Sequence, residues 1–175
     1  SRISPKKNLD FLLLSLLKVK VPIILDIYGV NSDEKYYKYC VNLINKLPSN
    51  IKVKIKQNVS HKKILKILSN YDLFAFPTKG ENFGHVIYES LSVGTPVLVS
   101  DKTPWQPGIE GSLQVLKLQK DKWAKFITNW SKLDTKKLIR NRHKAIKYIK
   151  NYNIKNLSLK KNKKLFISIL NISDI

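Results

Sequence analysis

The chain has 175 residues, 43% of them hydrophobic, which is enough for one compact domain with a sizeable core and argues against a disordered chain. Its 33 Lys and Arg residues against 12 Asp and Glu give a net charge of +21, which would suit a nucleic-acid partner. Proteins that bind nucleic acid favour Arg, however, and only three of the 33 basic residues are Arg. We therefore expect no nucleic-acid partner, and two interpretations of the charge stay open: a solvated face, or a face that contacts an anionic membrane surface or an anionic acceptor.

Helical and strand-like hydrophobic patterns alternate along almost the whole chain. In chain order we expect a helix over 9–17, a strand over 21–28, a helix over 33–47, a strand over 51–55, a helix over 61–68, a strand over 73–76, a helix over 84–92, strands over 97–99 and 114–118, and helices over 122–133, 135–152 and 157–170. Asp33 and Ser60 are the expected N-caps of two of these helices, and Pro48 closes the first of the two.

This alternation predicts an α/β fold with a parallel sheet of about five to six strands and helices on both faces. We expect residues 1–175 to form a single domain, in which the C-terminal helix at 153–175 packs outside the main sheet. Ligands of such sheets bind beyond the C-terminal ends of the strands, so the segments just past these ends are candidates for one shared crevice. They are Arg2, Gly29, Gln57-Asn58, the stretch 78–84 and the stretch 100–105.

Cys40 is the only cysteine, so no intrachain disulfide or cysteine-rich metal site can form, which suits a reducing compartment. No apolar run approaches the roughly 20 residues of a membrane span, and no basic region leads into an apolar core at the N-terminus, as it would in a signal peptide. We therefore expect a cytoplasmic protein, with a peripheral position at the inner face of the cytoplasmic membrane if its basic face binds lipid.

The stretch 77–89 carries the pattern with the most chemical content. Glu81 and Glu89 lie eight positions apart, Gly84 lies between them, and a strand-like run ending at Phe76 precedes the turn. A strand, a polar turn and a helix start bring free backbone N–H groups to a place where an anion can bind. Two carboxylates beside such a place suit a ligand with both phosphates and hydroxyls, such as a nucleotide-sugar. The alternative is that Glu81 only complements the helix dipole, that Gly84 only forms a turn, and that Glu89 is solvated.

Three segments together resemble family 4 retaining glycosyltransferases. The run Ser-Arg-Ile-Ser-Pro-Lys-Lys-Asn at 1–8 resembles their Gly-Arg-x-x-x-x-Lys-Gly loop, with Ser1 and Asn8 in the places of the two Gly. The run Glu-Asn-Phe-Gly-His-Val-Ile-Tyr-Glu at 81–89 resembles their Glu-x7-Glu motif, and the Gly-Thr-Pro-Val run at 94–97 follows in the same order. The resemblance implies the Rossmann-like C-terminal half of a GT-B enzyme, which binds the donor, and it implies that this chain is a fragment that lacks the other half.

The resemblance also assigns a role to each candidate residue. Arg2 and Lys7 would bind the diphosphate of a nucleotide-sugar donor, and with Glu81, which would contact the hexose hydroxyls, they form the expected catalytic set. Glu89 would bind the ribose hydroxyls. For His85 a plain position on the helix surface is the alternative. The expected donor-binding set is completed by the helix start beside the diphosphate and by a loop beneath the nucleobase: Asn82, Phe83, Gly84, His85, Val86, Asn58 and Val59.

The resemblance implies a hexosyltransferase that transfers a hexose to an acceptor hydroxyl with retained anomeric configuration, in the biosynthesis of surface polysaccharide, lipopolysaccharide or capsule. We expect a UDP-sugar donor, with GDP- and ADP-sugars as alternatives, and no metal, since the chain has no Asp-x-Asp motif. The glycan or lipid-linked acceptor would bind to the missing N-terminal domain, so the isolated chain should bind nucleotide without turnover. A hypothesis of another class is a non-catalytic module that binds polyanions or membrane surfaces through its basic charge.

Overall fold

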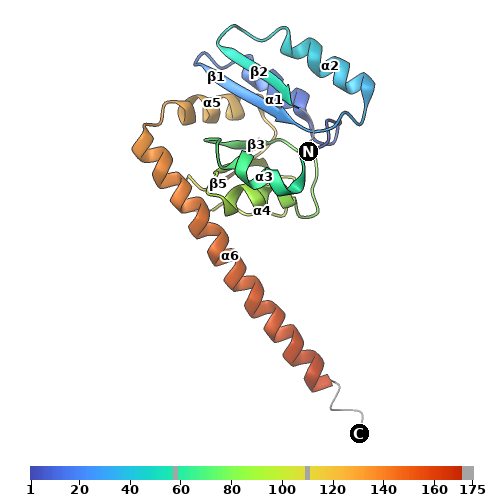
Figure 1. Cartoon of the computed structure of the whole chain (residues 1–175), viewed down its shortest axis with the longest axis vertical. Coiled ribbons are helices and arrows are strands. Elements are labelled where there is room, and N and C mark those ends of the chain that lie inside the picture. Colours follow the sequence, from blue (N-terminus) through green and yellow to red (C-terminus); the bar gives the residue numbers. More distant parts are fainter. Residues whose placement is uncertain (57–58, 109–110, 171–175) are drawn as a thin grey trace.

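The computed structural model describes residues 1–56, 59–108 and 111–170, and the five strands in these ranges form two parallel sheets (Figure 1). One sheet pairs β1 with β2, and the other has the order β3-β4-β5. The α/β class, the parallel direction and the number of strands agree with the sequence prediction. The strands are β1 (Ile23–Tyr28), β2 (Ile51–Lys56), β3 (Phe74–Phe76), β4 (Val97–Ser100) and β5 (Leu113–Leu116).

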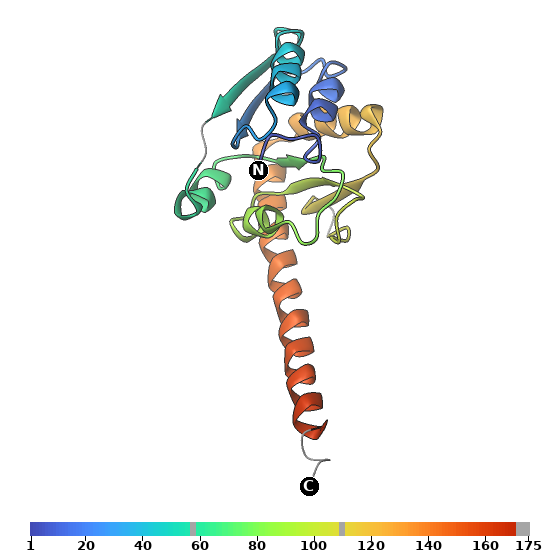
Figure 2. The same cartoon turned by 90° about the vertical axis from the view of Figure 1, so that its right-hand side faces the viewer.

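Helices cover both faces of the sheets (Figures 1 and 2). On one face α1 packs against α2 and α5, and on the other face α4 packs against α3 and α6. Strand β4 lies between these layers, because the side chain of Leu98 joins the core built with α1 and α5, whereas Val97 and Val99 join the core built with α4 and α6. The helices are α1 (Leu9–Leu16), α2 (Glu34–Ile44), α3 (His61–Leu68), α4 (His85–Ser92), α5 (Lys120–Ser131) and α6 (Thr135–Leu170).

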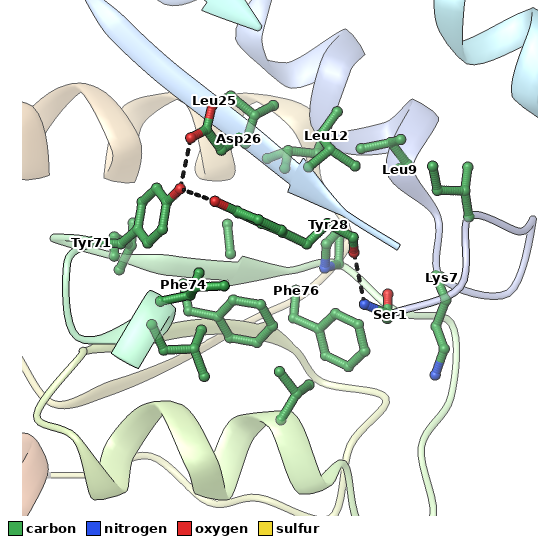
Figure 3. Close-up of a pocket in the computed structure, with 18 of the residues that line it drawn as sticks. Ser1, Lys7, Leu9, Leu12, Leu25, Asp26, Tyr28, Tyr71, Phe74 and Phe76 are labelled. Carbon is green, nitrogen blue, oxygen red and sulfur yellow. Dashed lines mark hydrogen bonds between the residues drawn. The ribbon is translucent and has the colours of Figure 1, made fainter. Parts of the chain in front are cut away.

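The single sheet that the sequence predicts is divided between β1 and β3. No backbone hydrogen bonds pair these two strands in the part of the chain that the structure describes. The hydroxyl of Tyr71 donates to Oδ2 of Asp26 at 2.6 Å and lies 2.9 Å from the hydroxyl of Tyr28 (Figure 3). Paired strands lie only about 4.8 Å apart, which leaves no room for rings between them. Side chains therefore bridge the two sheets at the place where a backbone ladder was expected.

The expected N-caps have different outcomes. Asp33 precedes α2, and its carboxylate accepts a hydrogen bond from the N–H of Tyr36 at 2.9 Å, as a capping residue should. Ser60 precedes α3, but its side chain makes no capping hydrogen bond to the described residues. The cap at Asp33 is therefore confirmed, and Ser60 has the position of a cap without its bond.

Helix α6 corrects the prediction of two helices at 135–152 and 157–170, because it runs unbroken from Thr135 to Leu170. The interval 153–156 contains two Asn, which lower helix propensity by only about 0.7 kcal/mol each relative to Ala, and 135–170 contains neither Gly nor Pro. Its 36 residues span about 54 Å at 1.5 Å per residue, and its second half extends away from both sheets (Figure 1). Among the described helices, none combines the length and apolarity that a membrane crossing requires.

Candidate functional site

Residues 1–8 form a loop that lies against the end of β1. Ile3 is buried, and its N–H donates to the carbonyl of Val30 at 2.9 Å. Gly29, directly after β1, permits this approach, because a Cβ at Gly29 would lie 1.7 Å from the carbonyl oxygen of Ser1. The loop is therefore held at the C-terminal end of a strand, where the sequence predicts a ligand crevice.

Asn8 has a backbone conformation that favours glycine. Its φ of 62° and ψ of 38° lie in the left-handed region, and no other non-glycine residue in the described ranges has a positive φ. Asn adopts this conformation more readily than most L-residues. Its side chain is buried, and Nδ2 donates to the carbonyl of Pro77 at 2.9 Å. Asn8 therefore adopts a conformation open to Gly and links the loop to the turn after β3.

The turn after β3 is fixed by two buried hydroxyl groups. Oγ1 of Thr78 lies 3.2 Å from the carbonyl oxygen of Lys6 and 3.1 Å from that of Gly80. Ser100, the last residue of β4, donates to the carbonyl of Thr78 at 2.5 Å. The N–H of Lys79 donates to the carbonyl of Lys6 at 2.8 Å. The turn is thus tied on one side to the loop at the end of β1 and on the other to β4.

Lys7 and Glu81 meet where this loop and this turn face each other. Nζ of Lys7 contacts Oε1 of Glu81 and lies 5.2 Å from the ring centroid of Phe76. The side chains of Lys7 and Glu81 are 17% and 14% exposed, so the pair is largely shielded from water, and each charge acts more strongly on the other than at the surface. An anion that binds Lys7 competes with Glu81, and the released carboxylate can then accept hydrogen bonds from hydroxyl groups.

The start of α4 is built by Gly84 and Trp105. Gly84 is the N-cap with a φ of 79°, and a Cβ there would lie 2.8 Å from Cδ1 of Ile87. Nε1 of Trp105 donates to the carbonyl of Phe83 at 2.5 Å, and the Trp105 ring is buried. The sequence leaves open whether Trp105 shapes the crevice or packs; the structure has it packed, and it holds the backbone of the helix start. His85 lies exposed with its ring centroid 5.0 Å from that of Phe83.

A cavity of about 170 Å³ lies between β1 and β3 and is lined along both strands, from Ile24 to Tyr28 and from Leu73 to Phe76. Figure 3 shows Ser1, Lys7 and Phe76 toward one end of this cavity and Asp26 with Tyr71 toward the other. Three of the predicted site residues line it, and the contact with Lys7 adds Glu81 to the same place. Its lining also includes Arg2, Pro77 and Val86.

Glu89 belongs to the same electrostatic environment. Burial lowers the pKa of the Ser1 amino group, the charge of Lys7 lowers it further, and the charges of Glu81 and Glu89 raise it. The charges of both carboxylates of the Glu-x7-Glu motif therefore reach the Ser1 amino group, as the charge of Lys7 does. Glu89 itself is half-buried on α4.

For the remaining predicted residues no contact with Lys7 or Glu81 is described. Asn82 is exposed on the turn before α4. Val59 is half-buried after β2, while Asn58 lies outside the described residues together with Gln57, so the nucleobase loop stays a prediction. The described residues contain no group of three or more His, Cys, Asp or Glu that could hold a metal ion, and metal independence also stays a prediction.

Sequence reasoning missed the residues that hold the site in place. It took Asn8 only as a departure from the family pattern and gave no separate role to Thr78 and Ser100. The available signal was a small polar residue at or just after a buried strand, because a hydroxyl group buried there must find a backbone partner. The link from Trp105 to Phe83 had no such signal, since it joins two loops.

Solved structures with the same fold include HepE (Alr3699) of Anabaena in complex with UDP and glucose, at 22% identity and a TM-score of 0.71, covering 94% of this chain and 47% of HepE. The catalytic domain of the cholesterol-α-glucosyltransferase from Helicobacter pylori is 21% identical with a TM-score of 0.71, covering 87% of this chain and 94% of that domain. The pneumococcal O-GlcNAc transferase GtfA, solved with UDP and GlcNAc, is 19% identical with a TM-score of 0.66, covering 97% of this chain and 35% of GtfA. The chain thus spans about half the length of HepE, and the likeness establishes the shared fold.

No curated protein matches the sequence closely. The family model described as glycosyl transferases group 1 matches residues 1–152, a range that includes both strand-end loops and every predicted site residue. Since this match covers most of the chain, and the solved structures share its fold, the chain belongs to the glycosyl transferases group 1.

Proposed function

We propose that this chain is the donor-binding half of a retaining hexosyltransferase that transfers a hexose from a nucleotide-sugar to an acceptor hydroxyl. The observation that supports it most directly is the contact between Lys7 and Glu81, which joins the basic loop to the Glu-x7-Glu turn at the ends of β1 and β3. A cation and a carboxylate at one point suit a ligand that offers a phosphate to the first and sugar hydroxyls to the second.

Each side chain has a distinct task in this proposal. Arg2 and Lys7 bind the diphosphate, and the start of α4 after Gly84 adds the positive end of a helix dipole. Negative charge develops on the nucleoside diphosphate as the glycosidic bond breaks, so these groups stabilise the transition state more than the ground state. Glu81 accepts hydrogen bonds from the hexose hydroxyls, and Glu89 accepts them from the ribose. The positive charge that a metal ion would otherwise supply comes from the protein.

A UDP-sugar is the donor that we favour over GDP- and ADP-sugars. Three structures with this fold support it: HepE was solved with UDP and glucose and also with UDP-glucose, and GtfA was solved with UDP and GlcNAc. These ligands belong to those proteins, and their transfer to this chain is part of the proposal.

The acceptor is proposed to bind to a part of the protein outside this chain, since the chain spans 47% of HepE. A glycan or lipid-linked acceptor would assign the enzyme to the assembly of surface polysaccharide, lipopolysaccharide or capsule. The net charge of +21 supports a peripheral position at the inner face of the cytoplasmic membrane, because anionic lipids attract each nearby Lys or Arg by about 1 kcal/mol.

Calorimetric titration of this chain with UDP, GDP and ADP tests the donor site. We expect UDP to bind, and we expect Lys7→Gln to weaken that binding while Lys35→Gln, the same change at an exposed position of α2, leaves it unchanged. Circular dichroism before each titration verifies that the chain is folded. If none of the three nucleotides binds the folded chain, the proposal is wrong.

The competing hypothesis is a non-catalytic module that binds polyanions or membrane surfaces by charge alone, and the net charge of +21 favours it. Under that hypothesis Glu81→Ala and Glu89→Ala leave ligand binding intact, and a rise in salt concentration abolishes it. Under the donor-site proposal both substitutions weaken binding of the nucleotide-sugar, because each removes acceptors for ligand hydroxyls. Titration of the two variants with UDP-glucose at two salt concentrations separates the hypotheses.

A further inference from the structure

A second basic site lies at the edge of the sheet β3-β4-β5 that is opposite the C-terminal strand ends of the candidate donor site. It is a groove of about 470 Å³ at the start of β5, between the end of α5 and the first turns of α6. These three elements meet at one side of the molecule (Figures 1 and 2). The groove is lined by Gly111, Gln114, Phe126, Asn129, Trp130, Leu133, Lys137, Arg140, Asn141 and Lys144.

The lining of the groove suits an anion. Lys137, Arg140, Asn141 and Lys144 recur at three and four residues, which places them on one face of α6. The groove residues in the described ranges include three cations and three side-chain amides but no Asp or Glu. One of the cations, Lys137, forms an ion pair with Asp134 at 3.5 Å, which leaves Arg140 and Lys144 for an anion. A volume of about 470 Å³ exceeds that of a single ion and falls in the range of small-molecule sites, so the anionic group would belong to a larger molecule.

Arg140 distinguishes this groove from the rest of a lysine-rich surface. Of the three arginines, Arg2 lines the cavity at the candidate donor site, and Arg142 donates to the carbonyls of Ser69 at 2.5 Å and Tyr71 at 2.9 Å. The side chain of Arg140 has no hydrogen bond or ion pair to the described residues, and neither does the side chain of the half-buried Lys144. An Arg without a protein partner, in a groove with further donors, is available for the oxygens of a phosphate group.

One wall of the groove is aromatic and holds an unpaired donor. The rings of Trp130 and Phe126 stack with centroids 5.5 Å apart and planes at 24°. Nε1 of Trp130 is buried and has no hydrogen-bond partner among the described residues. The two stacked rings favour a ligand that carries an apolar ring or chain.

We propose that this groove binds a phosphate group carried by a sugar or by a phospholipid headgroup. Arg140 and Lys144 contact the phosphate oxygens, and Trp130 and Phe126 contact the group that carries the phosphate. The site is separate from the candidate donor site and would hold a second anionic ligand, beyond the nucleotide-sugar of the proposed function. The two sources of phosphate share this chemistry and differ in whether the ligand is soluble or part of a bilayer.

Fluorescence titration with glucose 6-phosphate tests the soluble source. All variants carry Lys7→Gln, so that the candidate donor site contributes little to the signal. We expect the intrinsic tryptophan fluorescence to change, the change to disappear in Trp130→Phe, and glucose without phosphate to have no effect. Arg140→Gln with Lys144→Gln should raise the dissociation constant about tenfold, the loss expected for a charge-assisted contact. The control is Lys147→Gln with Lys150→Gln, which removes two exposed cations of the same helix outside the groove.

Sedimentation with vesicles tests the headgroup source. The probes are vesicles of phosphatidylglycerol mixed with phosphatidylcholine, and vesicles of phosphatidylcholine alone. A loss of binding to the anionic vesicles in the Arg140 and Lys144 variant, but not in the Lys147 and Lys150 control, supports the proposal with a lipid source. The proposal is overturned if the Arg140 and Lys144 variant binds glucose 6-phosphate and the anionic vesicles as tightly as the chain with Lys7→Gln alone, or if the Lys147 and Lys150 control loses as much binding.

Discussion

The two basic sites of the molecule hold their cations in different ways. At the candidate donor site, Lys7 is 17% exposed and contacts Glu81, and its loop is linked by Asn8 to the turn after β3. In the groove beside α6, Arg140 is exposed, and within the described residues no carboxylate pairs with it. A cation with an internal partner has a fixed position and must exchange that partner for a ligand, whereas a cation without one is available but loosely positioned. The arrangement at Lys7 suits a reaction that needs defined geometry, and the arrangement at Arg140 suits the attraction of an anionic ligand.

Asn8 should have the largest effect on stability, because the geometry of the first site depends on it. Asn8→Ala removes the bond to Pro77 and forces an alanine into the left-handed region, which together lower the free energy of unfolding by about 3 kcal/mol. Asn8→Gly loses only the bond, so we expect about 1 kcal/mol. Urea unfolding measures both. Equal losses in the two variants would contradict the role of the left-handed conformation.

The pair of Lys7 and Glu81 comes next. Glu81→Gln leaves a largely buried Lys7 without its carboxylate and should lower the free energy of unfolding by about 2 kcal/mol. The double variant Lys7→Gln and Glu81→Gln should recover part of this loss, because no uncompensated charge remains. Urea unfolding of the two single variants and the double variant completes the cycle. Additive effects would mean that the contact couples the two charges weakly, and the contrast with the groove would then disappear.

Arg140 and Arg142 lie two positions apart on α6 and should separate binding from stability. Arg142→Gln removes the donors to two backbone carbonyls beyond α3 and should lower the free energy of unfolding by about 1 to 2 kcal/mol. Arg140→Gln should change it by less than about 0.5 kcal/mol, since surface substitutions without partners have small effects. Thermal unfolding measures the change in stability of both variants. The glucose 6-phosphate titration measures the binding that each variant retains. The opposite pattern would assign Arg140 to the fold.

The smallest effect concerns alkaline pH and a region away from both sites. Burial raises the pKa of the Cys40 thiol to about 11, so the folded chain keeps this proton at a pH where the unfolded chain loses it. Stability from this group is complete below its ordinary pKa of 9.0 and is lost as the pH rises toward the folded value of about 11. By pH 10 we expect a loss of about 1 kcal/mol that is absent in Cys40→Ala. Equal pH slopes in the two chains, measured by urea unfolding between pH 8 and pH 10.5, would contradict it.

The sequence predicts the parts of the fold that local patterns determine. Strand β4 was predictable because Val97 to Val99 form an uninterrupted apolar run, and the cap of α2 because Asp33 precedes an amphipathic helix. The division between β1 and β3 was not predictable, since it depends on Tyr71 reaching Asp26 from 45 residues away. The prediction divided α6 because Asn153 and Asn156, which are weak helix formers, were interpreted as a break between two helices.

The candidate site divides in the same way. Its motif residues stand out in the sequence, but the residues that hold them act through contacts between distant segments, as Asn8 does with Pro77 across 69 residues. The groove beside α6 left no local signal at all. In a chain with a net charge of +21, three more cations on one helix do not differ from their neighbours until the fold places them beside Trp130.

The division of the strands into two sheets has a consequence for the way the molecule opens. Because no ladder joins β1 to β3 within the described residues, each sheet can exchange its amide hydrogens through its own local opening. The candidate donor site draws Lys7 from the unit with β1 and Glu81 from the unit with β3. A nucleotide bound across both must leave before either unit opens, so its binding should slow hydrogen exchange in β1 and β3 together and join two cooperative units into one.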